Sequence, residues 1–134
     1  MNDILQQIER FHGHLGPYAV IGYRMGLLAN KHLGTTPFSK QVTLWTGTAP
    51  PLSCIIDGVQ LSSGCTLGTG KITVHQENLP KAQFINTKGQ QIEILLKPEI
   101  QQEIDTTVTE DNIIDYACKT YEKSDSELFE LKKL

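Results

Sequence analysis

The fold of this chain is decided by one long segment, Pro17-Tyr-Ala-Val-Ile-Gly-Tyr-Arg-Met-Gly-Leu-Leu-Ala-Asn-Lys-His-Leu33, which is followed by Gly34. Pro17 suits the first position of a helix because its missing N–H is no loss there. Gly34 is typical of a helix end. Gly22 and Gly26 lie four residues apart inside the predicted helix, and each costs about 1 kcal/mol relative to alanine. Glycines at this spacing predict that another backbone or a ligand packs closely against the helix.

Two further helices are predicted around this segment. The first covers residues 3–11, where Asp3 and Gln6 form a start that resembles a capping box. Its apolar residues recur at helical spacing and therefore share one face. The second covers residues 54–63, where Ser53 is a suitable N-cap. The helices over 3–11 and 17–33 form the expected N-terminal pair.

Residues rich in β-formers predict four strands, over 41–48, 71–75, 82–87 and 91–97. The composition of Asn86-Thr-Lys-Gly89 is that of a tight turn, so the last two strands should form a hairpin. The residues after Pro98 are predicted to be helical. They end in a helix with a capping box at Ser124 and Glu127; its apolar residues are Leu128, Phe129 and Leu131. We therefore expect one α+β domain over 1–134, with a mixed or antiparallel sheet packed with helices and a helical C-terminal tail.

The composition excludes several classes of protein. The 134 residues are 39% hydrophobic and 20% charged, with a net charge of −3, which suits one globular core and argues against a nucleic-acid partner. The sequence contains neither an apolar run long enough to span a membrane nor a signal peptide. We therefore expect a cytoplasmic protein with no membrane partner. Three cysteines without a Cys-x-x-Cys pair indicate free thiols rather than a disulfide scaffold.

His12 and His14 are the first candidate metal ligands. Two histidines separated by one residue point to the same side of an extended backbone, where neutral ring nitrogens can approach one ion. A histidine at the end of a helix is also favoured by the helix dipole. The pair alone therefore leaves both interpretations open.

Cys65 lies in Gly64-Cys-Thr-Leu-Gly-Thr-Gly70, a segment with three glycines in seven residues. Such a loop exposes backbone N–H groups, which stabilise a thiolate or hold an anion. A free cysteine can also be a small buried apolar residue. The neighbouring glycines favour the functional interpretation.

Cys54, Asp57 and Gln60 are predicted on the helix over 54–63. The first turn of a helix lowers the pKa of a thiol such as Cys54. Asp57 and Gln60, spaced i and i+3, can supply hydrogen bonds around a ligand or substrate. A buried thiol beside a solvated carboxylate explains the pattern equally well. Arg24 can present its guanidinium to an anionic substrate, or it can form a surface ion pair.

Two strings together resemble the core domain of the E-subunit family of formylmethanofuran dehydrogenase. The first is Phe11-His-Gly-His-Leu-Gly-Pro-Tyr-Ala-Val-Ile-Gly-Tyr-Arg24, and the second is Cys54-Ile-Ile-Asp-Gly-Val-Gln-Leu-Ser-Ser-Gly-Cys-Thr-Leu-Gly-Thr-Gly70. The similarity spans about residues 8–98, and the expected helical tail follows over 99–134. Many members of that family carry a cysteine where this chain has Gly16, and many end in a cysteine-rich zinc finger that is absent after Cys118.

The resemblance implies an α+β core, a homodimer and a metal site. The implied site residues are His14 and Cys65 first, and then His12, Cys54, Asp57 and Gln60. Nitrogen and sulfur ligands suit zinc, although iron and nickel also fit. Gly16 implies that the site differs from that of many relatives by one ligand.

Three functions follow as hypotheses. The first is a metal-binding protein, or a metal-dependent enzyme of C1 or redox metabolism with an unknown small-molecule substrate and with Asp57 as an orienting base. The second is an accessory subunit, without chemistry of its own, of a molybdenum- or tungsten-dependent oxidoreductase. The third is a thiol redox module that uses Cys54 and Cys65.

Overall fold

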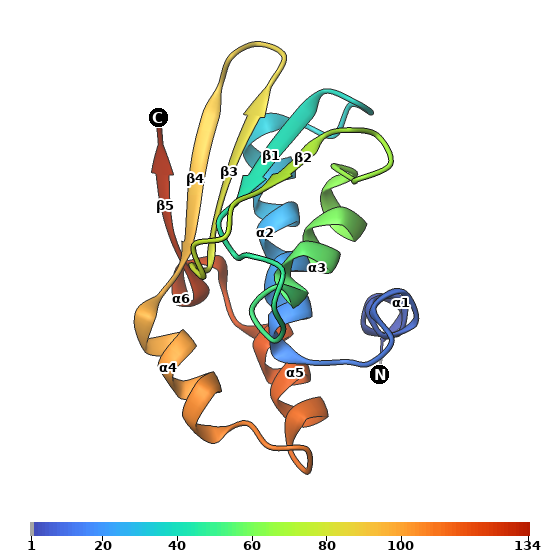
Figure 1. Ribbon diagram of the computed structural model, residues 1–134, viewed down its shortest axis with the longest axis vertical. Helices are drawn as coiled ribbons and strands as arrows, with labels where there is room; N and C mark the ends of the chain where they lie inside the picture. The colour runs from blue at the N-terminus through green and yellow to red at the C-terminus, as the bar shows by residue number, and fades with distance from the viewer. Residues whose placement is uncertain (1) are drawn as a thin grey trace.

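The computed structural model describes residues 2–134. Within them the chain forms helices and strands in the following order (Figure 1): α1 (Asp3–His12), α2 (Pro17–Leu33), β1 (Lys40–Leu44), α3 (Cys54–Ser63), β2 (Ile72–Val74), β3 (Lys81–Asn86), β4 (Gln91–Leu96), α4 (Pro98–Thr107), α5 (Ile113–Glu122), α6 (Asp125–Leu128) and β5 (Phe129–Lys133). The architecture is α+β, as the sequence predicts.

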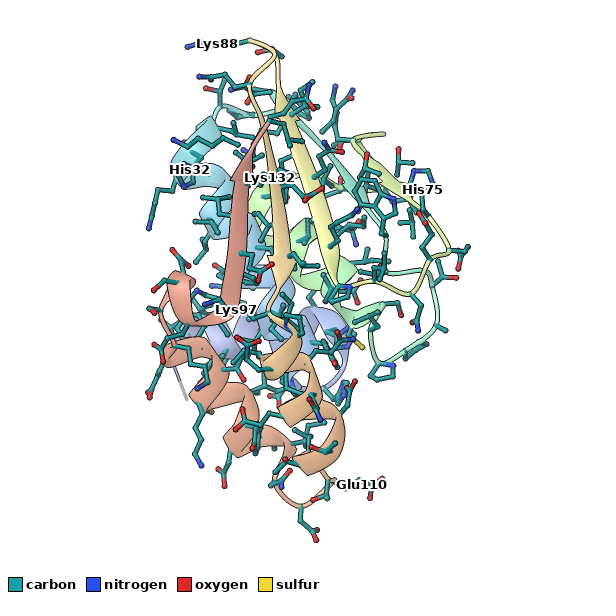
Figure 2. The ribbon with its side chains drawn as sticks, turned by 90° about the vertical axis from the view of Figure 1, so that its left-hand side faces the viewer. His32, His75, Lys88, Lys97, Glu110 and Lys132 are labelled. Carbon is teal, nitrogen blue, oxygen red and sulfur yellow. The ribbon has the colours of Figure 1, made fainter. Side chains whose placement is uncertain are left out.

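The five strands form one mixed sheet in the order β2-β1-β3-β4-β5. Strands β1 and β2 are parallel, with Val42 opposite Ile72, and every other neighbouring pair is antiparallel. The predicted hairpin joins β3 to β4, and its turn is closed by a hydrogen bond of 3.0 Å from the Gly89 N–H to the Asn86 carbonyl. Lys88 in this hairpin and Glu110 between α4 and α5 mark opposite ends of the molecule (Figure 2).

The core consists of two clusters of buried apolar side chains. The larger cluster lies between α2, α3 and the inner face of the sheet, and the sheet contributes Val42, Leu44, Ala82, Phe84, Ile92, Ile94 and Leu96. The smaller cluster joins α1, α2 and α5 through Leu5, Ile8, Leu15, Ala19, Val20 and Ala117. Helix α2 belongs to both clusters, which makes it the centre of the fold.

Glycines allow α2 and α3 to cross in backbone contact. A methyl group on Gly22 would overlap the carbonyl oxygen of Ile55, and one on Gly58 would overlap that of Ala19. The expectation of a close neighbour on this face of α2 is confirmed, and the neighbour is the backbone of α3. The same contact fixes where α3 presents its polar residues.

The ends of the predicted helices are largely confirmed. Helix α2 begins at Pro17 and ends before Gly34, and α3 ends before Gly64. The N-cap of α1 is Asn2 rather than Asp3, because the Asn2 side chain accepts a hydrogen bond of 2.8 Å from the Leu5 N–H. Ser53 occupies the N-cap position of α3 without a capping hydrogen bond from its side chain.

The prediction of a helix through the last residues is wrong. The capping box of Ser124 and Glu127 is present, but α6 has only four residues. The chain then extends as β5 and pairs with the edge of β4, placing Phe129 opposite Leu96. Phe129 is thereby buried against the sheet. The first predicted strand is also shorter than expected, since β1 ends at Leu44.

Among residues 2–134, no helix combines the length and the apolar character needed to cross a membrane.

Candidate functional site

The centre of the candidate site is a hydrogen bond between α1 and α3. His12, the last residue of α1, lies with its Nδ1 atom 2.6 Å from Oδ2 of Asp57 on the first turn of α3. The His12 side chain is only 12% exposed, whereas the Asp57 side chain is 36% exposed. The carboxylate therefore holds a largely buried imidazole whose Nε2 atom is not used in this bond.

His14 lies next to His12. The chain turns at Gly13, whose φ of 99° favours glycine. The two imidazole rings then lie with their centroids 5.0 Å apart and their planes at 32°. The expectation that both rings share one side is confirmed, but a left-handed turn brings this about rather than an extended backbone.

A side chain at position 16 would lie in van der Waals contact with His14. A methyl group at this position would lie 3.5 Å from Nε2 of His14 and 3.4 Å from Cδ1 of Ile113 on α5. The position where many relatives carry a cysteine therefore adjoins the histidine pair. In this chain the same position offers no ligand atom from a side chain.

Gln60 connects Asp57 to the glycine-rich loop. Its Nε2 atom lies 3.4 Å from Oδ1 of Asp57, and its Oε1 atom accepts a hydrogen bond of 2.9 Å from the Leu67 N–H. The predicted shared face of Asp57 and Gln60 on α3 is thus present. The two side chains form a line of hydrogen bonds from the loop to the imidazole of His12.

Cys54 is half-buried at the start of α3 and packs against both core clusters. Burial raises the pKa of its thiol, and the nearby Asp57 carboxylate raises this pKa further, against a smaller opposite effect from a backbone hydrogen bond. The expectation of a lowered thiol pKa is therefore wrong, because loss of solvent outweighs the helix dipole.

Cys65 follows the opposite end of α3. Cys65 is 2% exposed, and its Sγ atom donates a hydrogen bond of 3.4 Å to the Lys40 carbonyl oxygen. Burial raises the pKa of this thiol despite the hydrogen bond from Ser63 and the positive charges of Lys40 and Lys71. The thiol is thus buried instead of exposed as a thiolate.

The proposed ligands fall at two ends of one helix. Helix α3 has ten residues, and a rise of about 1.5 Å per residue separates its ends by roughly 15 Å. His12 contacts the first turn, whereas Cys65 lies beyond the last. In the part of the chain that the structure describes, no group of three or more His, Cys, Asp or Glu side chains is arranged to hold one ion.

Arg24 faces the C-terminal segment. Its guanidinium donates hydrogen bonds of 2.6 Å to the carbonyl oxygens of Tyr121 and Lys123, and it lies 2.9 Å from Oδ1 of Asp125. The side chain is 12% exposed. These contacts agree with the ion-pair alternative and link α2 to the tail.

Two features of polar residues were not predicted from the sequence. The Tyr18 hydroxyl donates a hydrogen bond of 2.6 Å to Asp105, and burial is the largest cause that raises the pKa of Tyr18. Lys40 is buried although it is a lysine at the start of a strand. No local pattern indicates either feature, because each depends on segments that meet only in the folded chain.

The fold and the histidine pair define an α+β protein with a carboxylate-supported imidazole site. Residues 11–130 match the family described as "FmdE, Molybdenum formylmethanofuran dehydrogenase operon". The chain belongs to this FmdE family, and the resemblance found in the sequence is confirmed.

Two known proteins are similar to this chain, one in structure and one in sequence. An FmdE-like protein from Syntrophus aciditrophicus, described with reference to a tungsten formylmethanofuran dehydrogenase, has the same fold. Its TM-score is 0.72, with 22% identity, and the match covers 97% of this chain and 69% of that one. A protein of Archaeoglobus fulgidus described as a probable S-adenosyl-L-methionine-binding protein is 31% identical over 72 residues. That match covers 52% of this chain but only 19% of the relative.

Proposed function

We propose that this chain is a metal-binding member of the FmdE family whose site is built around His12 and His14. The observation that supports the proposal most strongly is the 2.6 Å contact between Nδ1 of His12 and the Asp57 carboxylate. Histidines that bind metals usually donate their other ring N–H to a carboxylate, which fixes the tautomer and makes the free nitrogen more basic. Here this arrangement leaves Nε2 of His12 as the donor atom for an ion.

The donor set suits a divalent transition metal, with zinc as the first choice and iron or nickel as alternatives. His12 and His14 would supply two nitrogen ligands. Cys54 starts the same helical turn that carries Asp57. Cys65, the other thiol proposed from the sequence, lies beyond the far end of α3 and within one chain does not reach an ion held by His12. Because metal binding displaces the proton of a thiol, the raised pKa of Cys54 makes ligation by this residue dependent on pH.

A homodimer is part of the same proposal. A second copy can complete the coordination of an ion for which one chain offers two adjacent imidazoles. The bound ion would supply Lewis-acid chemistry toward a small-molecule substrate. Asp57 would orient His12, and Gln60 would hold Asp57. We further propose that the protein works in the cytoplasm.

The decisive experiment measures metal content after purification without added metal, together with zinc affinity in competition with a chelator. A His12→Ala, His14→Ala double variant should lose bound metal, whereas His75→Ala, which changes a histidine outside the site, should retain it. Cys54→Ala should weaken metal binding, whereas Cys65→Ala, at the other end of α3, should leave it unchanged. Equal metal content in the wild type and the histidine double variant would refute the site.

A second candidate function is that of an accessory subunit. It is supported by the family description, which places FmdE in the operon of a molybdenum formylmethanofuran dehydrogenase. In that case the chain should copurify with a large oxidoreductase. Turnover of a small substrate by the isolated, metal-loaded chain would argue against an accessory role. The thiol redox module ranks third, because Cys54 and Cys65 lie at opposite ends of α3.

A further inference from the structure

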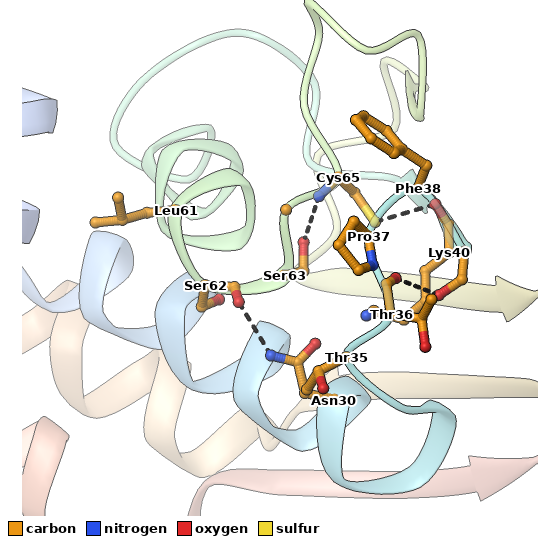
Figure 3. Close-up of a pocket in the computed structure, with 12 residues that line it drawn as sticks. Asn30, Thr35, Thr36, Pro37, Phe38, Lys40, Leu61, Ser62, Ser63 and Cys65 are labelled. Carbon is orange, nitrogen blue, oxygen red and sulfur yellow. Dashed lines mark hydrogen bonds between the residues drawn. The ribbon is translucent and has the colours of Figure 1, made fainter.

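A second region with features of a binding site lies at the far end of α3 from His12. It is a pocket of about 520 Å³ between the ends of α2 and α3 and the loop before β1 (Figure 3). Its volume is within the range of small-molecule sites. Its walls include Asn30 from α2, Ser63 and Cys65 from the end of α3, and Phe38 and Lys40 from the loop and β1.

Lys40 places a buried positive charge in the wall of this pocket. The residue is only 4% exposed, and its ammonium donates one hydrogen bond of 2.7 Å to the Gly34 carbonyl oxygen. Among residues 2–134, no carboxylate pairs with it. The C-terminal end of α2 offsets part of the charge, because a helix end carries about half an elementary charge. An ammonium has three N–H donors, so this contact leaves donors available.

Asn30 adds a buried acceptor to the same pocket. Its Nδ2 atom donates a hydrogen bond of 3.0 Å to the Ser62 carbonyl oxygen, which fixes the orientation of the amide. Its Oδ1 atom is buried and has no hydrogen-bond partner. Buried polar atoms in native proteins nearly always have partners. Among the described residues, no donor reaches this Oδ1 atom.

The remaining wall is suited to an apolar or planar group. Phe38 is 70% exposed, and Pro37 and Leu61 also line the pocket. Figure 3 shows Phe38 beside Cys65, whereas Asn30 lies on the other side of the pocket. An occupant can thus contact Lys40 and Asn30 with its polar atoms while its apolar part contacts Phe38.

We propose that this pocket binds a small organic carboxylate that also carries a hydrogen-bond donor. The carboxylate pairs with the Lys40 ammonium, the donor bonds to Oδ1 of Asn30, and an apolar or aromatic body packs on Phe38. This inference does not depend on the metal site, because the His12–Asp57 contact lies at the other end of α3.

The test uses 2-aminobenzoate, which combines a carboxylate, a neutral N–H donor and an aromatic ring, and its uncharged analogue 2-aminobenzamide. Each is titrated into the ¹⁵N-labelled full chain and followed by NMR. We expect saturable shifts of amides around Asn30, Phe38, Lys40 and Cys65 with 2-aminobenzoate. A dissociation constant in the millimolar range is expected for a ligand of about ten heavy atoms. The amide analogue should bind at least about tenfold more weakly, because charge-assisted hydrogen bonds are the stronger ones.

Two variants complete the experiment. Lys40→Met should weaken 2-aminobenzoate binding about tenfold or more, whereas Lys88→Met in the exposed hairpin should leave it within about twofold. If Lys40→Met fails to fold, the comparison of the two probes on the wild-type chain is decisive alone. Equal affinity for both probes, shifts confined to residues outside the pocket, or no shifts at all would each overturn the proposal.

Discussion

The Nδ1 atom of His12 and the Oδ2 atom of Asp57 lie 2.6 Å apart and join the last residue of α1 to the first turn of α3. The two residues are 45 positions apart in the sequence. Their contact converts a histidine pair, which is a weak signal alone, into an imidazole of fixed orientation. It also gives Asp57 a positioning role that can be tested separately from the ligands.

Asp57→Asn should weaken zinc binding by about 10- to 100-fold while leaving the fold intact, because it removes the carboxylate that orients His12. The measurement is zinc affinity by chelator competition, with unfolding in urea as the check on stability. Asp111→Asn, in an exposed turn, is the matched control and should bind zinc like the wild type. Unchanged zinc affinity in the Asp57 variant would remove this residue from the proposed site.

Gly22→Ala should lower the free energy of unfolding by about 1–3 kcal/mol or more, because its methyl group overlaps the Ile55 carbonyl at the crossing of α2 and α3. Gly68→Ala is the control, since a methyl group there meets no atom within 4 Å. Urea unfolding of both variants measures the difference. Equal stabilities would show that the two helices can separate without penalty.

Arg24→Gln should lower the free energy of unfolding by about 2 kcal/mol, because it breaks hydrogen bonds from a charged group to Tyr121, Lys123 and Asp125. The zinc content should not change, since these contacts lie in the tail. A variant with wild-type stability but reduced metal binding would instead support the substrate-facing role considered from the sequence.

Asp125 should make the stability depend on pH. Burial raises the pKa of this carboxyl, but hydrogen bonds and charges from Arg24 and Lys31 outweigh burial, so the pKa lies below its ordinary value of 3.8. The carboxylate therefore stabilises the fold above that pH, and the contribution is lost as the pH falls through the lower folded-state value.

The contribution is expected to be about 1 kcal/mol, since the pair is only partly buried. Urea unfolding of the wild type and Asp125→Asn at several pH values measures it. The wild type should be the more stable at pH 6, and the difference should shrink as the pH falls below 3.8. A difference independent of pH would contradict the linkage.

In the folded protein, Cys65 should react with a thiol reagent on the order of tenfold or more slowly than Cys118. The reason is that the Cys65 thiol is buried and its pKa is raised. Timed alkylation followed by mass spectrometry measures each cysteine, and urea-unfolded protein supplies the reference. Fast labelling of Cys65, or a Cys54–Cys65 disulfide after mild oxidation, would favour the thiol redox alternative.

Local signals predicted much of the fold. Pro17 and Gly34 fix the ends of α2, and Gly22 indicates the close approach of a neighbour; each effect acts within a few residues. The last strand could not be predicted in this way. Leu128, Phe129 and Leu131 fit a helical stripe, but the edge of β4 offers Phe129 a paired backbone and a buried position. That edge exists only after the sheet has formed.

The sequence predicted some of the residues that lie together in the candidate site, but not their geometry. Asp57 and Gln60 share a face of α3 because of helical periodicity. Their partners, His12 and Leu67, are set by how α1 and the loop pack against that helix. The thiols of Cys54 and Cys65 were expected to be acidic, yet burial raises the pKa of both. Burial depends on the whole fold, so neither neighbouring glycines nor a helix start determines it.

The pairing of β5 with β4 also sets an order of events during synthesis. Strand β5 leaves the ribosome after every other strand, and Arg24 must wait for the same segment to supply its acceptors Tyr121, Lys123 and Asp125. The nascent chain can therefore pack α2, α3 and four strands while one edge of β4 remains open. Pairing of β5 with β4 and docking of the tail can then follow the packing of these earlier elements, and until that happens β4 presents an unpaired strand edge that can pair with another chain.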